Sequence, residues 1–185
     1  MLMEHIWHNE QFGEHWFDAQ EIYRQMVEHC RPDGKLVEVG CWKGRSTAFL
    51  LVEAFNKSPK IEVYAVDTWA GSPEHAGHAS IVDGSLYEEF SRNISPVSRQ
   101  LIALRIASPK AAEFFEDQSL DGVFIDAAHE YDAVSADIVA WKTKLIQGGI
   151  LAGHDYSSAW PGVISAVDAL CPGRKIVGQS WMVAC

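Results

Sequence analysis

The chain has 185 residues, 48% hydrophobic and 22% charged, a balance typical of one globular domain with a sizeable core. Its formal net charge of −10, with scattered lysines and arginines, argues against nucleic acid and anionic membranes as partners, because phosphate binding needs a basic face. Four widely spaced cysteines, no signal-peptide pattern and no membrane-spanning apolar run predict a soluble, cytoplasmic protein with reduced thiols.

The predicted elements alternate between helices and short strands. Apolar residues recur at helical spacing over 10–29, which predicts a helix that ends in the turn at 31–34. Residues 68–85 are rich in glycine and lack a clear period, so we expect a lid-like loop in which His75 and His78 are solvated. The other segments with clear patterns are strands at 35–39, 61–66, 101–106, 123–126, 149–152, 175–177 and 181–184, and helices at 45–56, 86–94, 109–117, 131–145 and 163–170.

Short apolar strands with helices between them are typical of a parallel sheet covered on both faces. The pattern therefore predicts a doubly wound α/β fold with a mostly parallel, seven-stranded sheet and an antiparallel C-terminal hairpin. Because no linker or repeat interrupts the pattern, residues 1–185 are expected to form a single domain with an N-terminal helical segment at 1–34.

A glycine loop with the sequence GCWKGRST, at 40–47, joins the first predicted strand to the next helix. Gly40 and Gly44 allow a tight turn and a close approach of backbone to ligand, and the helix start offers free N–H groups. The second strand ends on Asp67, where a carboxylate faces ribose hydroxyls. Trp42 stands where a dinucleotide-binding loop has its second glycine, which disfavours the alternative of a nicotinamide-dependent oxidoreductase.

The segment VEVGCWKG at 37–44 resembles motif I of class I S-adenosylmethionine methyltransferases. The segments FIDAAHEY at 124–131 and GGILAGHDY at 148–156 resemble the small-molecule branch of that family, which includes macrocin-type sugar O-methyltransferases and, more distantly, catechol O-methyltransferase. The resemblance covers about residues 35–165 and implies a Rossmann-like fold that binds S-adenosylmethionine. The residues expected to contact that cofactor are Glu38, Gly40, Cys41, Trp42, Gly44, Ser46, Asp67, Thr68, Trp69, Ser108 and Asp126.

Two further acids, Asp126 and Asp155, each close an apolar strand at the sheet edge where ligands bind in open α/β folds. The resemblance implies a divalent cation, Mg²⁺ or Mn²⁺, held by Asp126, His154 and Asp155. Imidazole is a poor ligand for Mg²⁺. Three alternatives therefore stay open: a metal held by the two acids and water, a softer ion such as Mn²⁺, or no metal.

His129 follows Asp126 by three residues, where the strand gives way to a helix. The resemblance implies that His129 is the general base and that Asp126 shares in catalysis, and an imidazole suits proton removal near neutral pH. The alternative is that His129 only caps the helix or packs against the loop. The predicted reaction is O-methylation of a small hydroxylated acceptor, with N-methylation and a binding protein without catalysis as further alternatives. A small open pocket, or a homodimer whose second subunit completes it, fits this short chain.

Overall fold

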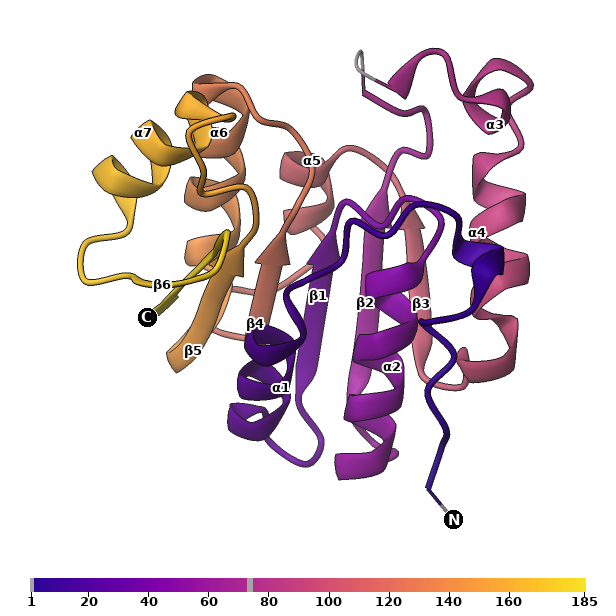
Figure 1. Cartoon of the computed structure of the whole chain (residues 1–185). Helices are drawn as coiled ribbons and strands as arrows, with labels where there is room; N and C mark the ends of the chain where they lie inside the picture. Colours follow the sequence, from indigo (N-terminus) through magenta and orange to yellow (C-terminus); the bar gives the residue numbers. More distant parts are fainter. Residues whose placement is uncertain (1, 73–74) are drawn as a thin grey trace.

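The structure is a computed structural model that describes residues 2–72 and 75–185 (Figure 1). Seven strands form one sheet in the order β3-β2-β1-β4-β5-β7-β6. The first five strands pair with one another in parallel, whereas β7 is antiparallel to both β5 and β6, which confirms the predicted fold class. The strands are β1 (Lys35–Val39), β2 (Glu62–Asp67), β3 (Leu101–Arg105), β4 (Leu120–Ile125), β5 (Leu145–Gly153), β6 (Lys175–Val177) and β7 (Ser180–Ala184).

Helices cover both faces of the sheet, because alternate strand residues point to opposite sides. On β4, Phe124 packs in the cluster that contains α1, α2 and α4, whereas Val123 and Ile125 pack in the cluster that contains α5, α6 and α7. The helices are α1 (Gln20–His29), α2 (Arg45–Lys57), α3 (Ala79–Val82), α4 (Leu86–Ile94), α5 (Ser108–Ala112), α6 (Tyr131–Lys142) and α7 (Pro161–Leu170), with short 3₁₀ turns η1 (Glu10–Phe12) and η3 (Ser95–Val97).

The helix predicted over 10–29 is wrong in its first half. Only η1 and α1 are helical, and residues 13–19, which we call the strap, connect them without regular structure. Gly13 has a φ of 70°, which a right-handed helix does not allow, and the carbonyls of Gly13 and Glu14 bond to Arg45 instead of to a helical turn. The helical spacing of Phe12 and Trp16 was coincidental, since the Trp16 side chain is 52% exposed.

Three smaller boundaries also differ from the prediction. The loop at 68–85 contains the short helix α3, the helix predicted at 109–117 is only α5, and the helix predicted at 131–145 ends at Lys142. Leu145 begins β5 because its backbone pairs with Leu120 of β4, a contact that the local apolar pattern does not specify. Within the described residues, no helix is long and apolar enough to cross a membrane, and all four cysteines are free thiols.

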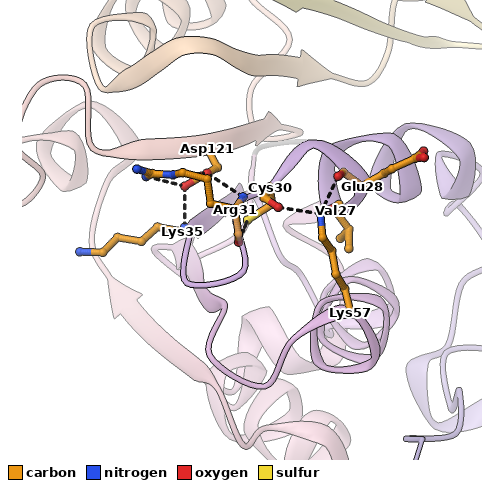
Figure 2. A network of polar contacts seen from close by, with 7 residues as sticks. All are labelled: Val27, Glu28, Cys30, Arg31, Lys35, Lys57 and Asp121. Carbon is orange, nitrogen blue, oxygen red and sulfur yellow. Dashed lines mark hydrogen bonds and ion pairs between the residues drawn. The ribbon is translucent and has the colours of Figure 1, made fainter.

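At the amino end of the sheet, one buried carboxylate ties three segments together (Figure 2). Asp121 of β4 accepts hydrogen bonds from the backbone and guanidinium N–H groups of Arg31 and from the backbone N–H of Lys35. Nearby, the Lys57 ammonium donates to carbonyls at the end of α1 and just beyond it, those of Val27, Glu28 and Cys30. A Cβ on Gly34 would collide with the Asp121 carboxylate, so glycine is needed in this turn.

Candidate active site

A cavity of about 790 Å³ lies at the carboxyl ends of the parallel strands. Its walls come from the glycine loop after β1, the ends of β2, β4 and β5, and the strap, whose dark indigo trace passes across the ends of β2 and β1 in Figure 1. This is the edge where open α/β sheets bind ligands. The predicted site residues that line the cavity are Gly40, Cys41, Trp42, Ser46, Asp67, Thr68, Asp126, His129, His154 and Asp155.

The glycine loop is held in shape by Asp67 at the end of β2. One carboxylate oxygen of Asp67 accepts hydrogen bonds from the backbone N–H groups of Cys41 (2.8 Å) and Trp42 (3.1 Å), and the other accepts from the N–H of Trp69 (2.7 Å). Gly40 has a φ of 84°, and a Cβ there would collide with the backbone carbonyl of Asp126. Because a carboxylate can accept about four hydrogen bonds, Asp67 keeps capacity for a ligand hydroxyl.

Glu38 lies beneath the glycine loop and does not line the cavity. It is fully buried on β1 and accepts hydrogen bonds from the Tyr23 hydroxyl (2.7 Å) and the Thr47 hydroxyl. Burial raises the pKa of Glu38, and the hydrogen bonds from Ser46, Thr47 and Tyr23 oppose that rise. Glu38 therefore supports the loop and the first turn of α2 from below.

Trp69, Ser108 and Gly44 also lie outside the cavity wall. The Trp69 ring is 2% exposed and donates its indole N–H to the carbonyl of Trp42 at 3.1 Å, which braces the glycine loop from behind. The Ser108 hydroxyl accepts a hydrogen bond from the indole of Trp141 at 2.8 Å. The predicted cofactor contacts of these three residues and of Glu38 stay predictions.

His129 and Asp155 form a hydrogen-bonded pair between the ends of β4 and β5. Nε2 of His129 lies 3.0 Å from Oδ2 of Asp155, and its ring stacks on Trp160 with centroids 3.8 Å apart. Asp155 has a φ of 59°, a strained conformation for a residue other than glycine. Burial alone would raise the pKa of Asp155, but hydrogen bonds from His129 and His154 hold that pKa well below its usual range. The carboxylate is therefore charged and fixes the orientation of the His129 imidazole.

His154 sits among three carboxylates. Its Nε2 lies 2.6 Å from Oδ1 of Asp18 in the strap, and its Nδ1 lies 3.3 Å from Oδ1 of Asp155 and 4.0 Å from Oδ1 of Asp126. Burial lowers the pKa of His154, but these carboxylates raise it to about 9. Burial in the cavity floor, with Asp155 and Glu38 nearby, raises the pKa of Asp126. The Asp126 side chain is 36% exposed, so water in the cavity moderates that rise.

The strap was not recognised in the sequence, although it supplies one wall of the cavity. Arg45, which is 6% exposed, holds the start of the strap by donating from its guanidinium to the carbonyls of Gly13 (2.8 Å) and Glu14 (3.0 Å), and it also donates to the carbonyl of Trp7 (2.6 Å). A cation in the first turn of a helix opposes the helix dipole. An arginine at this unfavourable position was the one signal in the sequence that Arg45 binds to groups outside its own helix.

The lid residues His75 and His78 are half-buried and pack against aromatic rings, which the expectation of a solvated loop did not include. The His75 ring packs 4.7 Å from the Trp42 ring and stacks on Trp16 at 5.2 Å, and the His78 ring meets Trp42 edge-on at 5.1 Å. Gln179, in the turn between β6 and β7, also lines the cavity and was likewise missed. The strap, the lid and the C-terminal hairpin thus complete the cavity from segments far apart in sequence.

Comparison with known proteins identifies the chain. A family model described as a methyltransferase domain matches residues 37–156, which include the glycine loop, Asp67, Asp126, His129 and Asp155. The chain belongs to this methyltransferase family. A curated protein of Sinorhizobium fredii, the uncharacterized protein y4gI, is 29% identical over 155 residues, and the match spans 76% of this chain but only 16% of that protein.

Solved structures share the fold of this methyltransferase. The O-methyltransferase NovP superposes with a TM-score of 0.70 over 90% of this chain and 78% of NovP, at 19% identity. CalS11, a TDP-rhamnose 3'-O-methyltransferase of calicheamicin biosynthesis, gives a TM-score of 0.62 at 13% identity over 90% of this chain and 77% of CalS11. Fibrillarin from Aeropyrum pernix, solved with natively bound S-adenosylmethionine, gives 0.55 at 13% identity over 83% of this chain and 66% of fibrillarin.

The cavity of this methyltransferase fits S-adenosylmethionine. Its volume, about 790 Å³, falls in the range of roughly 300–1,000 Å³ that is typical of small-molecule sites. The preformed glycine loop and the carboxylate of Asp67 line it together. Family and fold are those of a class I, S-adenosylmethionine-dependent methyltransferase, as the resemblance implied.

The donor set of Asp126, His154 and Asp155 fits a divalent cation. Each residue offers one ligand atom, and these atoms all lie within 4.8 Å of one another. Two carboxylates and one imidazole suit Mn²⁺ better than Mg²⁺, which prefers oxygen ligands. The Asp18 carboxylate contacts Nε2 of His154, the ring nitrogen that would not bind the metal. Carboxylates in this position commonly orient the histidines that bind metals. The metal itself stays a prediction.

Proposed function

We propose that the chain transfers a methyl group from S-adenosylmethionine to a hydroxyl of a small acceptor. The observation that carries this proposal is the hydrogen-bonded pair of His129 and Asp155, which lies in the same cavity as the glycine loop and Asp67. A base beside a cofactor loop is what hydroxyl methylation requires. When bound, S-adenosylmethionine supplies an electrophilic methyl group on a sulfonium and is released as S-adenosylhomocysteine after transfer to the acceptor oxygen.

Each cavity residue has a role in this proposal. Asp67 accepts hydrogen bonds from the ribose hydroxyls, and the glycine loop with the first turn of α2 receives the amino-acid end. His129 removes the proton of the acceptor hydroxyl, and Asp155 orients its ring and stabilises the imidazolium that forms. Asp126, at the floor of the cavity, binds the acceptor or the cofactor by hydrogen bonds. Holding both reactants in one cavity supplies much of the rate enhancement.

The proposal also includes a divalent cation in the cavity. Asp126, Asp155 and Nδ1 of His154 would hold it, and it would lower the pKa of the acceptor hydroxyl. The test is calorimetric titration of the protein with MnCl₂ and with MgCl₂. Heat from Mn²⁺ that is lost in Asp126→Asn supports the cation, and no heat from either metal removes it from the proposal.

The first experiment is calorimetric titration with S-adenosylhomocysteine, followed by mass spectrometry of hydroxylated compounds incubated with S-adenosylmethionine. We expect binding that Asp67→Ala abolishes, and products heavier by one methylene unit. No binding would refute the proposal. Binding without turnover of any acceptor would favour the alternative of a binding protein without catalysis. Products methylated on nitrogen only would replace the hydroxyl acceptor by an amine.

The predicted homodimer also stays a proposal, and analytical ultracentrifugation at assay concentration tests it. A dimer would fit a cavity that a second subunit completes. A monomer with full activity would refute it.

A further inference from the structure

The proposed general base lies on a loop. His129 belongs to residues 126–130, which connect β4 to α6 without regular structure. A loop does not fix a catalytic side chain by itself, so the geometry of His129 depends on groups that pack against it from neighbouring elements. The hydrogen bond to Asp155, at 3.0 Å, supplies one such constraint. A hydrogen bond at one ring atom fixes that atom but still allows the plane of the ring to turn about it.

Trp160 constrains the plane of the imidazole. Its indole lies against one face of the His129 ring, with the ring centroids 3.8 Å apart and an interplanar angle of 16°. This spacing is van der Waals contact for carbon atoms, so the imidazole cannot tilt toward the indole without a clash. Both residues line the same cavity. The stack therefore holds the base in one plane on the cavity wall.

The backbone of Trp160 is itself held in place at the start of α7. Its carbonyl accepts hydrogen bonds from the N–H groups of Val163 (3.1 Å) and Ile164 (3.3 Å), and its N–H donates to the carbonyl of Ser157 (2.9 Å). Pro161 follows and disfavours the helical conformation at Trp160, whose φ and ψ are −125° and 70°. The indole is thus presented from a fixed point at the end of a helix.

The start of α7 also meets the backbone of the His129 loop. A Cβ on Gly162 would lie 2.7 Å from the backbone nitrogen of Tyr131 and would collide with the carbonyl oxygen of His129. Glycine is therefore needed for α7 to approach the loop this closely. Behind this contact, Val163 of α7 and Val134 of α6 are buried in the same hydrophobic cluster. The loop and the start of α7 are thus packed together without space for a further side chain.

We propose that Trp160 is a positioning residue for His129, in which Asp155 fixes the ring at Nε2 and Trp160 fixes its plane. This inference rests on the proposed function and adds the residue that keeps the base aimed at the acceptor hydroxyl. A misplacement of about 1 Å can cost about 100-fold in rate. Loss of the stack should therefore reduce turnover, although Trp160 takes no part in the proton transfer.

The first measurement is the NMR spectrum of the chain with ¹³C-labelled histidine, which needs no substrate. The His129 ring signal is the one that His129→Gln removes. An indole stacked on the imidazole shifts the ring protons upfield, so Trp160→Ala should move this signal downfield. Trp160→Phe should keep part of the upfield shift. A His129 signal that Trp160→Ala leaves unchanged would overturn the inference.

The second measurement is a double-mutant cycle on the turnover of an identified acceptor. Trp160→Ala should lower kcat by about 10- to 100-fold, with less than a threefold change in the acceptor KM. Trp160→Phe, which keeps an aromatic ring, should restore most of the rate. In the His129→Gln background, Trp160→Ala should have less than a twofold further effect, because Trp160 acts through His129.

Phe114→Ala is the control for loss of an aromatic ring, because Phe114 is 68% exposed and lies outside the cavity, and its kcat should equal that of wild type. Affinity of Trp160→Ala for S-adenosylhomocysteine should stay within twofold of wild type, which shows that the variant is folded. Where Trp160→Ala does not fold, Trp160→Phe and Trp160→Leu are compared instead, and the leucine variant should lose the rate that phenylalanine keeps.

Three kinetic results would overturn the inference. A rise in acceptor KM without a fall in kcat would make Trp160 an acceptor contact. Losses that add in the double variant would give Trp160 a role independent of His129. A wild-type rate in Trp160→Ala, beside a large loss in His129→Gln, would leave the base without this support. Unchanged turnover in His129→Gln alone would instead refute the proposed base, and that result appears before Trp160 is changed.

Discussion

The two ends of the sheet treat buried charge in opposite ways. At the amino end, the Asp121 carboxylate has Arg31 as its counter-ion and accepts backbone N–H groups as well (Figure 2). At the carboxyl end, the side chains of Asp126 and Asp155 lie close together, and within the described residues their charged partners are histidines. Three of the four described non-glycine residues with positive φ, Trp42, Trp69 and Asp155, also lie at the carboxyl end. Strain and unbalanced charge are tolerated where a ligand is expected.

The largest effect, a loss of turnover, is expected for a substitution of His129 at the carboxyl end of the sheet. His129→Gln keeps polar atoms near Asp155 but removes a group that accepts a proton near neutral pH. We expect turnover of an identified acceptor to fall by about 10²–10⁴, the usual contribution of a general base. The measurement is initial rate by mass spectrometry, with S-adenosylhomocysteine affinity as the check that the cavity is intact.

His29→Gln serves as the control, because His29 lies exposed at the end of α1, away from the cavity. Turnover within threefold of wild type in His129→Gln would remove His129 from the mechanism and leave it a packing role against Trp160 and Asp155.

Breaking the amino end should instead cost stability. Asp121→Ala removes the acceptor of the Arg31 and Lys35 N–H groups, and unsatisfied groups of this kind cost about 3 kcal/mol in total. Urea denaturation measures the loss in the free energy of unfolding. Asp121→Asn, which keeps one carbonyl acceptor, should lose less.

Affinity for S-adenosylhomocysteine, measured where Asp121→Ala is still folded, should not change. A large fall in that affinity would show that the two ends are coupled, contrary to the comparison above.

Asp137 of α6 adds a third buried carboxylate to the comparison between the two ends of the sheet. It is buried, and no cation among the described residues pairs with it. Its Oδ1 makes no hydrogen bond within the described part of the chain, and burial raises its pKa to about 6, with a hydrogen bond from Ser108 opposing. A raised folded-state pKa means that this residue favours folding below about pH 4 and loses that contribution as the pH rises through 6. Asp137→Asn should therefore be more stable than wild type at pH 8 by about 2–3 kcal/mol.

The same comparison at pH 4.5 should show a smaller difference between Asp137→Asn and wild type, about 1 kcal/mol, because that pH is close to the unfolded-state pKa of the carboxyl. Asp132→Asn, an exposed position on α6, is the control and should show no such pH dependence. Equal stability of wild type and Asp137→Asn at pH 8 would mean that water or a local rearrangement satisfies the Asp137 carboxylate.

The strands, and the edge of the sheet at which ligands bind, could be predicted from the sequence because their signals are local. Apolar runs that end on Gly40, Asp67 and Asp126 define both the strands and the edge where ligands bind. The strap could not be predicted, because its conformation depends on bonds from Arg45 to Trp7 and Gly13, residues more than 30 positions away. Local periodicity contains no trace of such contacts.

The site was predicted as separate residues, but their pairing was not. His129 was expected as a base and Asp155 as a metal ligand, and the structure shows in addition that the two side chains are hydrogen-bonded to each other at 3.0 Å. That pairing requires β4 and β5 to be neighbours in register, which the sheet topology fixes and the motifs do not. The contact between Asp18 and His154 is of the same kind, because these two residues lie 136 positions apart in the sequence.

The smallest expected effect returns to the amino end, at Lys57. Its ammonium donates to the carbonyls of Val27 (2.7 Å) and Cys30 (2.6 Å), where the hydrogen bonds of α1 end and Val27 accepts only one backbone N–H, that of Cys30 at 3.2 Å, within the described residues. Lys57→Met keeps the apolar stem but leaves these carbonyls to water. We expect a loss of about 1 kcal/mol, comparable to a helix cap, or about 2–4 °C in Tm for a domain of this size. Lys60→Met, at an exposed position, is the control for loss of charge. Because the contact lies at the end opposite the cavity, cofactor affinity should be unchanged. An equal Tm for both lysine variants would assign the loss to charge instead of to the carbonyls of α1.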